Sequence, residues 1–70
     1  MKWIVSVKFN RPKAYHAFFS LLNRGRIKDT KLVNYSIPDL IAEFETTTEP
    51  EEDKIKKMGN VIDVKILEVK

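Results

Sequence analysis

The chain has 70 residues, with 13 Lys and Arg against 10 Asp and Glu, a formal net charge of +3 and no Cys. This length fits one domain, and the lack of Cys excludes disulfides, thiolate catalysis and zinc fingers. No apolar run approaches the ~20 residues of a membrane span, and MKWIVSVKF lacks the length and cleavage site of a signal peptide. We therefore expect a cytoplasmic protein. Its Lys-rich, Gln-free composition is compatible with a thermophilic source.

The N-terminal part predicts a strand followed by a helix. Alternate apolar positions predict that one face of the strand meets the helices, and that face is Trp3, Val5, Val7 and Phe9. Asn10 stands where an N-cap belongs, with Pro12 in the first helical turn. Apolar residues at helical spacing then predict a half-buried helix whose inward stripe is Ala14, Tyr15, Phe18, Leu21 and Leu22. Gly25 is the expected left-handed residue that ends this helix.

Three more strands are predicted. Residues 31–35 and 40–46 have strand character, and Pro38 between them cannot join a central ladder, which favours a hairpin connection. Residues 61–69 form the last strand. The order β-α-β-β-α-β predicts an α+β, ferredoxin-like (split βαβ) domain over residues 1–70. Its antiparallel sheet has the order 4-1-3-2, with both helices on one face.

The second helix is predicted from its polar residues. Thr48 and Glu51 match a capping box, and acidic residues before basic ones suit the helix dipole. Favourable i, i+4 pairs are expected between Glu52 and Lys56 and between Asp53 and Lys57. Ile55 and Met58 are its apolar residues, so it covers little of the sheet, and Gly59 ends it.

Residues that carry catalysis or bind metals are scarce. His16 is the only histidine and lies on the expected polar helix face, one turn before Ser20, so a solvated surface histidine is the simpler interpretation. No second His or Cys sets a metal-ligand spacing, and the acidic residues 49–53 are explained by a helix N-terminus. We therefore expect a protein that is not an enzyme and has no metal or cofactor.

The charge is unevenly distributed along the chain. Residues 1–38 hold eight Lys and Arg against Asp29, or +7, while residues 39–70 hold five Lys against nine acids, or −4. Lys2 and Lys8 can face Glu43 and Glu45 across neighbouring strands, so part of this asymmetry is internal complementarity.

A basic cluster around Gly25 leaves nucleic-acid binding open as an alternative. Its members are Arg24, Arg26, Lys28 and Lys31, which could hold phosphates. Cations at a helix C-terminus also have a purely structural explanation. The open sheet face offers no aromatic residue for base stacking, which excludes an RNA-recognition-motif surface. The alternative is thus an accessory protein that binds nucleic acid through this loop.

The segments PDLIAEFE and GNVIDVKILEV resemble the RAM domain, the C-terminal effector domain of Lrp/AsnC transcription regulators. The resemblance follows the chain in order and is specific over residues 39–45 and 59–67. It implies a stand-alone, non-catalytic regulatory module that binds a small-molecule effector and dimerises through its sheet. In that family the turn between strands two and three shapes the pocket, so the resemblance places ligand contacts at Asn34, Tyr35, Ser36 and Asp39. This chain lacks the Gly that the family usually carries there.

Size also favours self-association, because 70 residues without disulfides or metals build a core that barely offsets their conformational entropy. The face without helices is predicted to carry an apolar patch of Ile4, Ile41, Val33 and Leu67. A homodimer or higher oligomer through this face is expected, and Ile41→Lys should dissociate it. A purely structural interaction module is a second alternative.

Overall fold

The structure is a computed structural model, and it describes residues 1–57 and 59–70. Within them lie β1 (Trp3–Phe9), α1 (Pro12–Asn23), β2 (Thr30–Ser36), β3 (Ile41–Thr46), α2 (Glu52–Lys56) and β4 (Val61–Val69). The predicted succession of elements is confirmed. Met58, assigned from the sequence to the second helix, lies outside the described residues.

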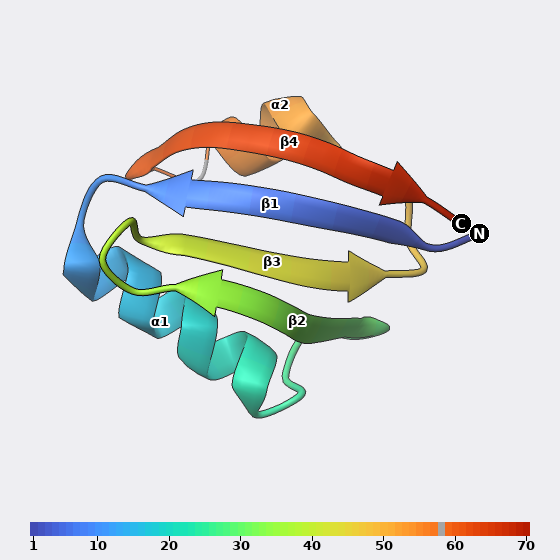
Figure 1. Cartoon of the computed structure of the whole chain (residues 1–70), viewed down its shortest axis with the longest axis horizontal. Helices are drawn as coiled ribbons and strands as arrows, with labels where there is room; N and C mark the ends of the chain where they lie inside the picture. Colours follow the sequence, from blue (N-terminus) through green and yellow to red (C-terminus); the bar gives the residue numbers. More distant parts are fainter. Residues whose placement is uncertain (58) are drawn as a thin grey trace.

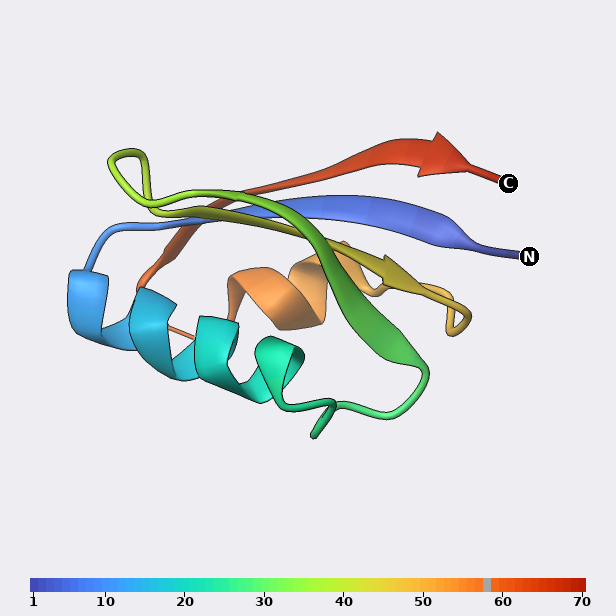
Figure 2. The same cartoon turned by 60° about the horizontal axis from the view of Figure 1, so that its bottom comes forward.

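The strands form one antiparallel sheet in the order β2-β3-β1-β4 (Figure 1). This is the predicted order read from the opposite edge, and it is compatible with a ferredoxin-like fold. Figure 2 shows both helices on one face of the sheet, so that the other face is open. α1 packs on β1, β2 and β3, whereas α2 packs on β4.

The core lies between the sheet and α1. Among the described residues, the buried hydrophobic side chains are Val5, Val7, Phe9, Tyr15, Leu22, Ala42, Phe44 and Val64. The predicted inward face of the first strand is confirmed, with Trp3 partly buried at its end. Leu21, predicted to be buried, is 46% exposed. Leu21 borders a surface hollow and does not pack into the core, so its side chain stays in contact with solvent.

The start of α1 differs from the prediction. Arg11, not Asn10, has the extended conformation of an N-cap, and no described side chain caps the helix. Asn10 instead prolongs the contact between β1 and β4, because its N–H donates to the Asn60 carbonyl oxygen at 2.8 Å. Pairing with the sheet has therefore overridden the capping preference of Asn10.

The end of α1 is as predicted. Gly25 has a φ of 67°, a conformation that side chains with a Cβ rarely adopt. Its N–H donates to the Leu22 carbonyl oxygen, and the N–H of Arg26 donates to that of Leu21. These two bonds form a Schellman motif, which satisfies carbonyl groups that the last helical turn would leave unpaired.

α2 begins later than predicted, and the capping box is wrong. Glu51 is the N-cap residue, without a capping bond from any described side chain, while the N–H of Thr48 donates to Thr46 Oγ1 at 3.2 Å. The cause is Pro50, which disfavours helical conformation in the residue before it. The ion pair present joins Lys54 to Glu51 at 2.9 Å. The two predicted i, i+4 pairs do not form in the described residues.

Tyr15 fastens α1 to the sheet. Its side chain is fully buried, and its hydroxyl donates to the Ile41 carbonyl oxygen at 3.0 Å. Its ring meets Phe9 edge-on, with 5.9 Å between centroids. Burial, together with the nearby Tyr35, raises the pKa of the Tyr15 phenol above its ordinary value.

Replacing Tyr15 by Phe removes this hydroxyl and its partly buried hydrogen bond to the Ile41 carbonyl oxygen. We expect the free energy of unfolding to fall by about 0.5–1.5 kcal/mol. Urea denaturation followed by circular dichroism measures the change. Tyr35→Phe is the matched control, since Tyr35 is 52% exposed, and it should change stability by less than about 0.5 kcal/mol.

The raised pKa also predicts how stability depends on pH. The folded state holds the Tyr15 proton more tightly than the unfolded state does. This contribution is complete below the unfolded pKa of about 10 and disappears as the pH rises through the folded pKa. Between about pH 9 and pH 11, wild type should therefore lose more stability than Tyr15→Phe in parallel urea titrations. Equal losses in the two proteins would contradict the assignment.

Candidate functional site

The four residues predicted as ligand contacts surround the β2–β3 turn and bind one another. The Ser36 hydroxyl donates to the Asp39 carboxylate at 2.9 Å, and the Tyr35 N–H donates to Asn34 Oδ1 at 2.9 Å. The Tyr35 ring packs edge-on against Phe19, at 5.1 Å between centroids. The turn does not line either of the two hollows described below. Ligand binding there stays a prediction.

The predicted nucleic-acid contacts separate into two groups. Arg24, Arg26 and Lys28 are exposed in the loop after α1, whereas Lys31 lies on β2, opposite Glu45 of β3. Three loop cations thus remain available for phosphates, and binding by them stays a prediction.

His16 is exposed on α1, as predicted. No cluster of His, Asp and Glu within the described residues has a geometry that could hold a metal ion. Across residues 1–57 and 59–70, no helix combines the length and the apolar character needed to cross a membrane.

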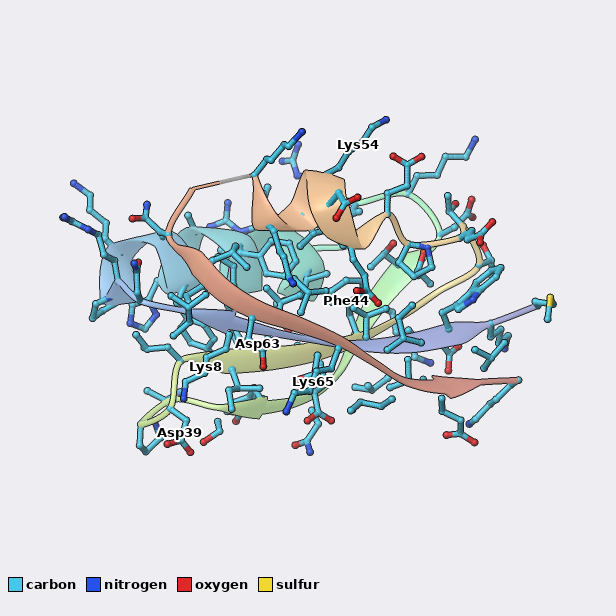
Figure 3. The ribbon with its side chains drawn as sticks, turned by 90° about the horizontal axis from the view of Figure 1, so that it is seen from above. Lys8, Asp39, Phe44, Lys54, Asp63 and Lys65 are labelled. Atoms are coloured by element: carbon cyan, nitrogen blue, oxygen red, sulfur yellow. The ribbon has the colours of Figure 1, made fainter. Side chains whose placement is uncertain are left out.

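The open face of the sheet mixes cations with anions. Lys2 Nζ lies 3.5 Å from a Glu45 carboxylate oxygen, which confirms one predicted contact between strands, and Lys65 Nζ lies 3.7 Å from Asp63. Lys8 is opposite Ile41 and Asp63, not Glu43. Figure 3 shows Lys8, Asp63 and Lys65 on this side of the sheet and Phe44 on the helix side.

The predicted dimer residues are distributed among these charges. Ile4 and Ile41 lie on the open face and are partly buried, with Glu45 and Lys8 opposite them on the neighbouring strand. Val33 and Leu67 lie at register irregularities of β2 and β4 and are 44% and 50% exposed. Dimerisation through this face stays a prediction.

An apolar hollow of about 270 Å³ opens between α1, α2 and the sheet, lined by Phe18, Ile27, Thr30, Phe44 and Ile55. Thr30 is the polar member of this lining. Its hydroxyl donates to the Lys28 carbonyl oxygen at 3.0 Å and hydrogen-bonds with the Thr46 hydroxyl at 3.2 Å. The lining therefore offers apolar surface and a hydroxyl whose hydrogen bonds are already made.

α2 contributes one residue to the lining of the hollow. This helix packs on β4 and turns one partly buried apolar residue, Ile55, toward the core. The loop after Gly25 brings Ile27 to the other side. A second, shallower hollow of about 230 Å³ lies beside it, with Phe18 common to both, lined also by Phe9, Ala14, Ala17, Leu21, Gly59 and Asn60.

Sequence reasoning missed the hollow, since five separate segments supply its lining. One signal was available: Ile27 stands alone between two cations in a loop, where an apolar residue is expected only if it packs against something. Comparison of the chain with protein-family models, curated proteins and solved structures finds no match.

Ile55 is the side chain that anchors α2, so Ile55→Ala should enlarge the hollow and loosen this helix. We expect a loss of about 1–2 kcal/mol in the free energy of unfolding, less than for a fully buried isoleucine. Hydrogen exchange should accelerate at the Ile55 and Lys57 amides, which close the helix. Lys56→Ala is the control, because its side chain is exposed. Unchanged protection in Ile55→Ala would argue against the anchoring role.

Proposed function

We propose that the protein is a small, non-catalytic regulatory module that binds an apolar small molecule in the hollow between α1, α2 and the sheet. The apolar lining carries this proposal. A site of this kind gains free energy by removing an apolar group from water. Its single polar side chain, Thr30, is already hydrogen-bonded and has no neighbouring base in the lining, so the hollow offers binding without an evident nucleophile.

The charges around the hollow favour a ligand with an anionic end. Ile27 lies between Arg26 and Lys28 in the sequence, and Ile55 lies between Lys54 and Lys56. All four cations are exposed, and Lys54 is paired with Glu51. With the acids of the same segments included, residues 26–29 and 51–57 hold five cations against four anions, a net charge of +1. This small positive excess slightly favours an anionic end on the ligand and leaves the interior to its apolar part. The ligand class is therefore an apolar carboxylate.

The architecture supports the regulatory part of the proposal. The strand order and the common face of the helices fit a ferredoxin-like domain over residues 1–70, and residues 39–45 and 59–67 resemble a RAM domain. A stand-alone module of this type acts by changing shape or assembly when its effector binds. α2 is the suitable responding element, because Ile55 both lines the hollow and holds this helix.

Straight-chain carboxylates of about four to eight carbons, chosen for the size of the hollow, and amines of the same lengths form the test. The carboxylates should raise the melting temperature by mass action, and the amines should not. Ile55→Trp fills the hollow and should abolish the shift. Ile37→Trp, in the exposed β2–β3 turn, is the matched control and should retain it.

Absence of a shift with every carboxylate, or a shift that persists in Ile55→Trp, would overturn the proposal. The nucleic-acid alternative makes a different prediction. It requires an association with DNA or RNA that weakens steeply with salt and is lost in the double variant Arg24→Glu, Arg26→Glu.

A further inference from the structure

β4 is an edge strand with apolar side chains exposed to solvent. It is the outer neighbour of β1 in the sheet, and four of its large hydrophobic residues are 38–54% exposed: Ile62, Ile66, Leu67 and Val69. Figure 3 looks onto this edge and shows α2 beside the strand, on the helix side, with the edge itself uncovered by the described residues. A long edge strand of this composition is a template for pairing with another strand.

The second half of this strand is complementary to itself. Residues 63–70 read Asp-Val-Lys-Ile-Leu-Glu-Val-Lys. An antiparallel copy centred between Ile66 and Leu67 places Asp63 opposite Lys70, Val64 opposite Val69, Lys65 opposite Glu68 and Ile66 opposite Leu67. Each charge then meets an opposite charge and each apolar residue an apolar one. Directly opposed side chains in antiparallel strands are close enough to interact.

Neighbouring registers lack this match. If the centre moves to Lys65, that lysine faces its own symmetry mate. If it moves between Lys65 and Ile66, Asp63 faces Glu68. If it moves to Ile66, Lys65 faces Leu67 and leaves its charge unmatched. Like charges directly opposite one another are unfavourable, so the charge pattern selects one register.

The backbone independently supports the same register. Lys2 and Lys70 exchange two hydrogen bonds, of 3.0 and 2.7 Å, so both direct their backbone groups toward each other. The direction of the backbone N–H and C=O alternates from one residue of a strand to the next. Because Lys70 directs these groups toward β1, the preceding residue, Val69, which is opposite Trp3, directs them away from β1. Val7 is an even number of residues from Trp3 in β1, so both direct their backbone groups away from β4. Val64, which is opposite Val7, therefore also directs its N–H and C=O away from β1.

Val64 and Val69 are the pair that the charge-matched register brings together. Both have outward backbone groups, as a hydrogen-bonded antiparallel pair requires. Lys65 and Glu68, which turn their backbone groups inward, would form the adjacent non-hydrogen-bonded pair, in which side chains are closest. The register irregularity near Leu67 falls on the symmetry axis, so regular pairing is needed only on either side of it.

We infer that two copies of this chain pair antiparallel through β4, about a two-fold axis between Ile66 and Leu67. The two sheets become one continuous sheet, and the open faces take no part in the contact. This inference goes beyond the proposed ligand binding and does not depend on it, because its readout is the mass of the particle in solution.

The test is a pair of charge reversals read by light scattering coupled to size exclusion. Wild type should have twice the 8.2 kDa mass of the chain at high micromolar concentration. Lys65→Glu alone and Glu68→Lys alone each place like charges opposite one another twice, and each should be monomeric. The double variant restores the matched pairs and should be dimeric. Mixing the two single variants should yield a heterodimer, a result that misfolding cannot produce.

Lys13→Glu, on exposed α1, is the control for net charge and should remain dimeric. A monomeric wild type, or single variants that stay dimeric, would overturn the inference. So would a double variant that is folded by circular dichroism yet monomeric. A dimer that Ile41→Lys dissociates and Lys65→Glu leaves intact would place the interface on the open face instead.

Discussion

The structure depends on how much of a sheet so short a chain can cover. One twelve-residue helix packs on three strands, and a five-residue helix packs on the fourth. Each ordered residue costs roughly 1.5 kcal/mol of conformational entropy, so the apolar burial of a small core leaves only a small net free energy in favour of folding. The Tyr15 hydroxyl gives the main helix a fixed position on this core, because it bonds to the backbone of β3.

Limited coverage explains the other surfaces. The open face of the sheet remains compatible with water because its strands alternate cations and anions, including the contact between Lys2 and Glu45. The flank beside α2 is incompletely filled, which leaves the hollow between Phe18 and Ile55. At the edge, β4 keeps apolar side chains exposed. All three surfaces follow from the small number of apolar side chains available to cover the sheet. The hollow and the edge of β4 are the two that suit contact with another molecule.

Alternation and composition were sufficient to predict the strands, the inward face of β1 and the end of α1 at Gly25. They failed where two local preferences competed. Asn10 is a favourable N-cap residue but pairs with the sheet. Thr48 does not become an N-cap because Pro50 constrains the residue before it. Leu21 has the spacing of a buried residue, yet the structure places it beside a surface hollow. The hollow was beyond sequence reasoning because its lining comes from five segments that only the fold brings together.

The position of β1 has a consequence for the order of folding. β1 lies inside the sheet, but one of its two partners, β4, is the last strand in the chain, and Trp3 pairs with Val69. Contacts between such distant residues form slowly, because the search for them is long. Until β4 pairs with it, the edge of β1 that faces away from β3 has no partner strand. Pairing of β4 covers that edge of β1, and the outer side of β4 then becomes the edge of the sheet.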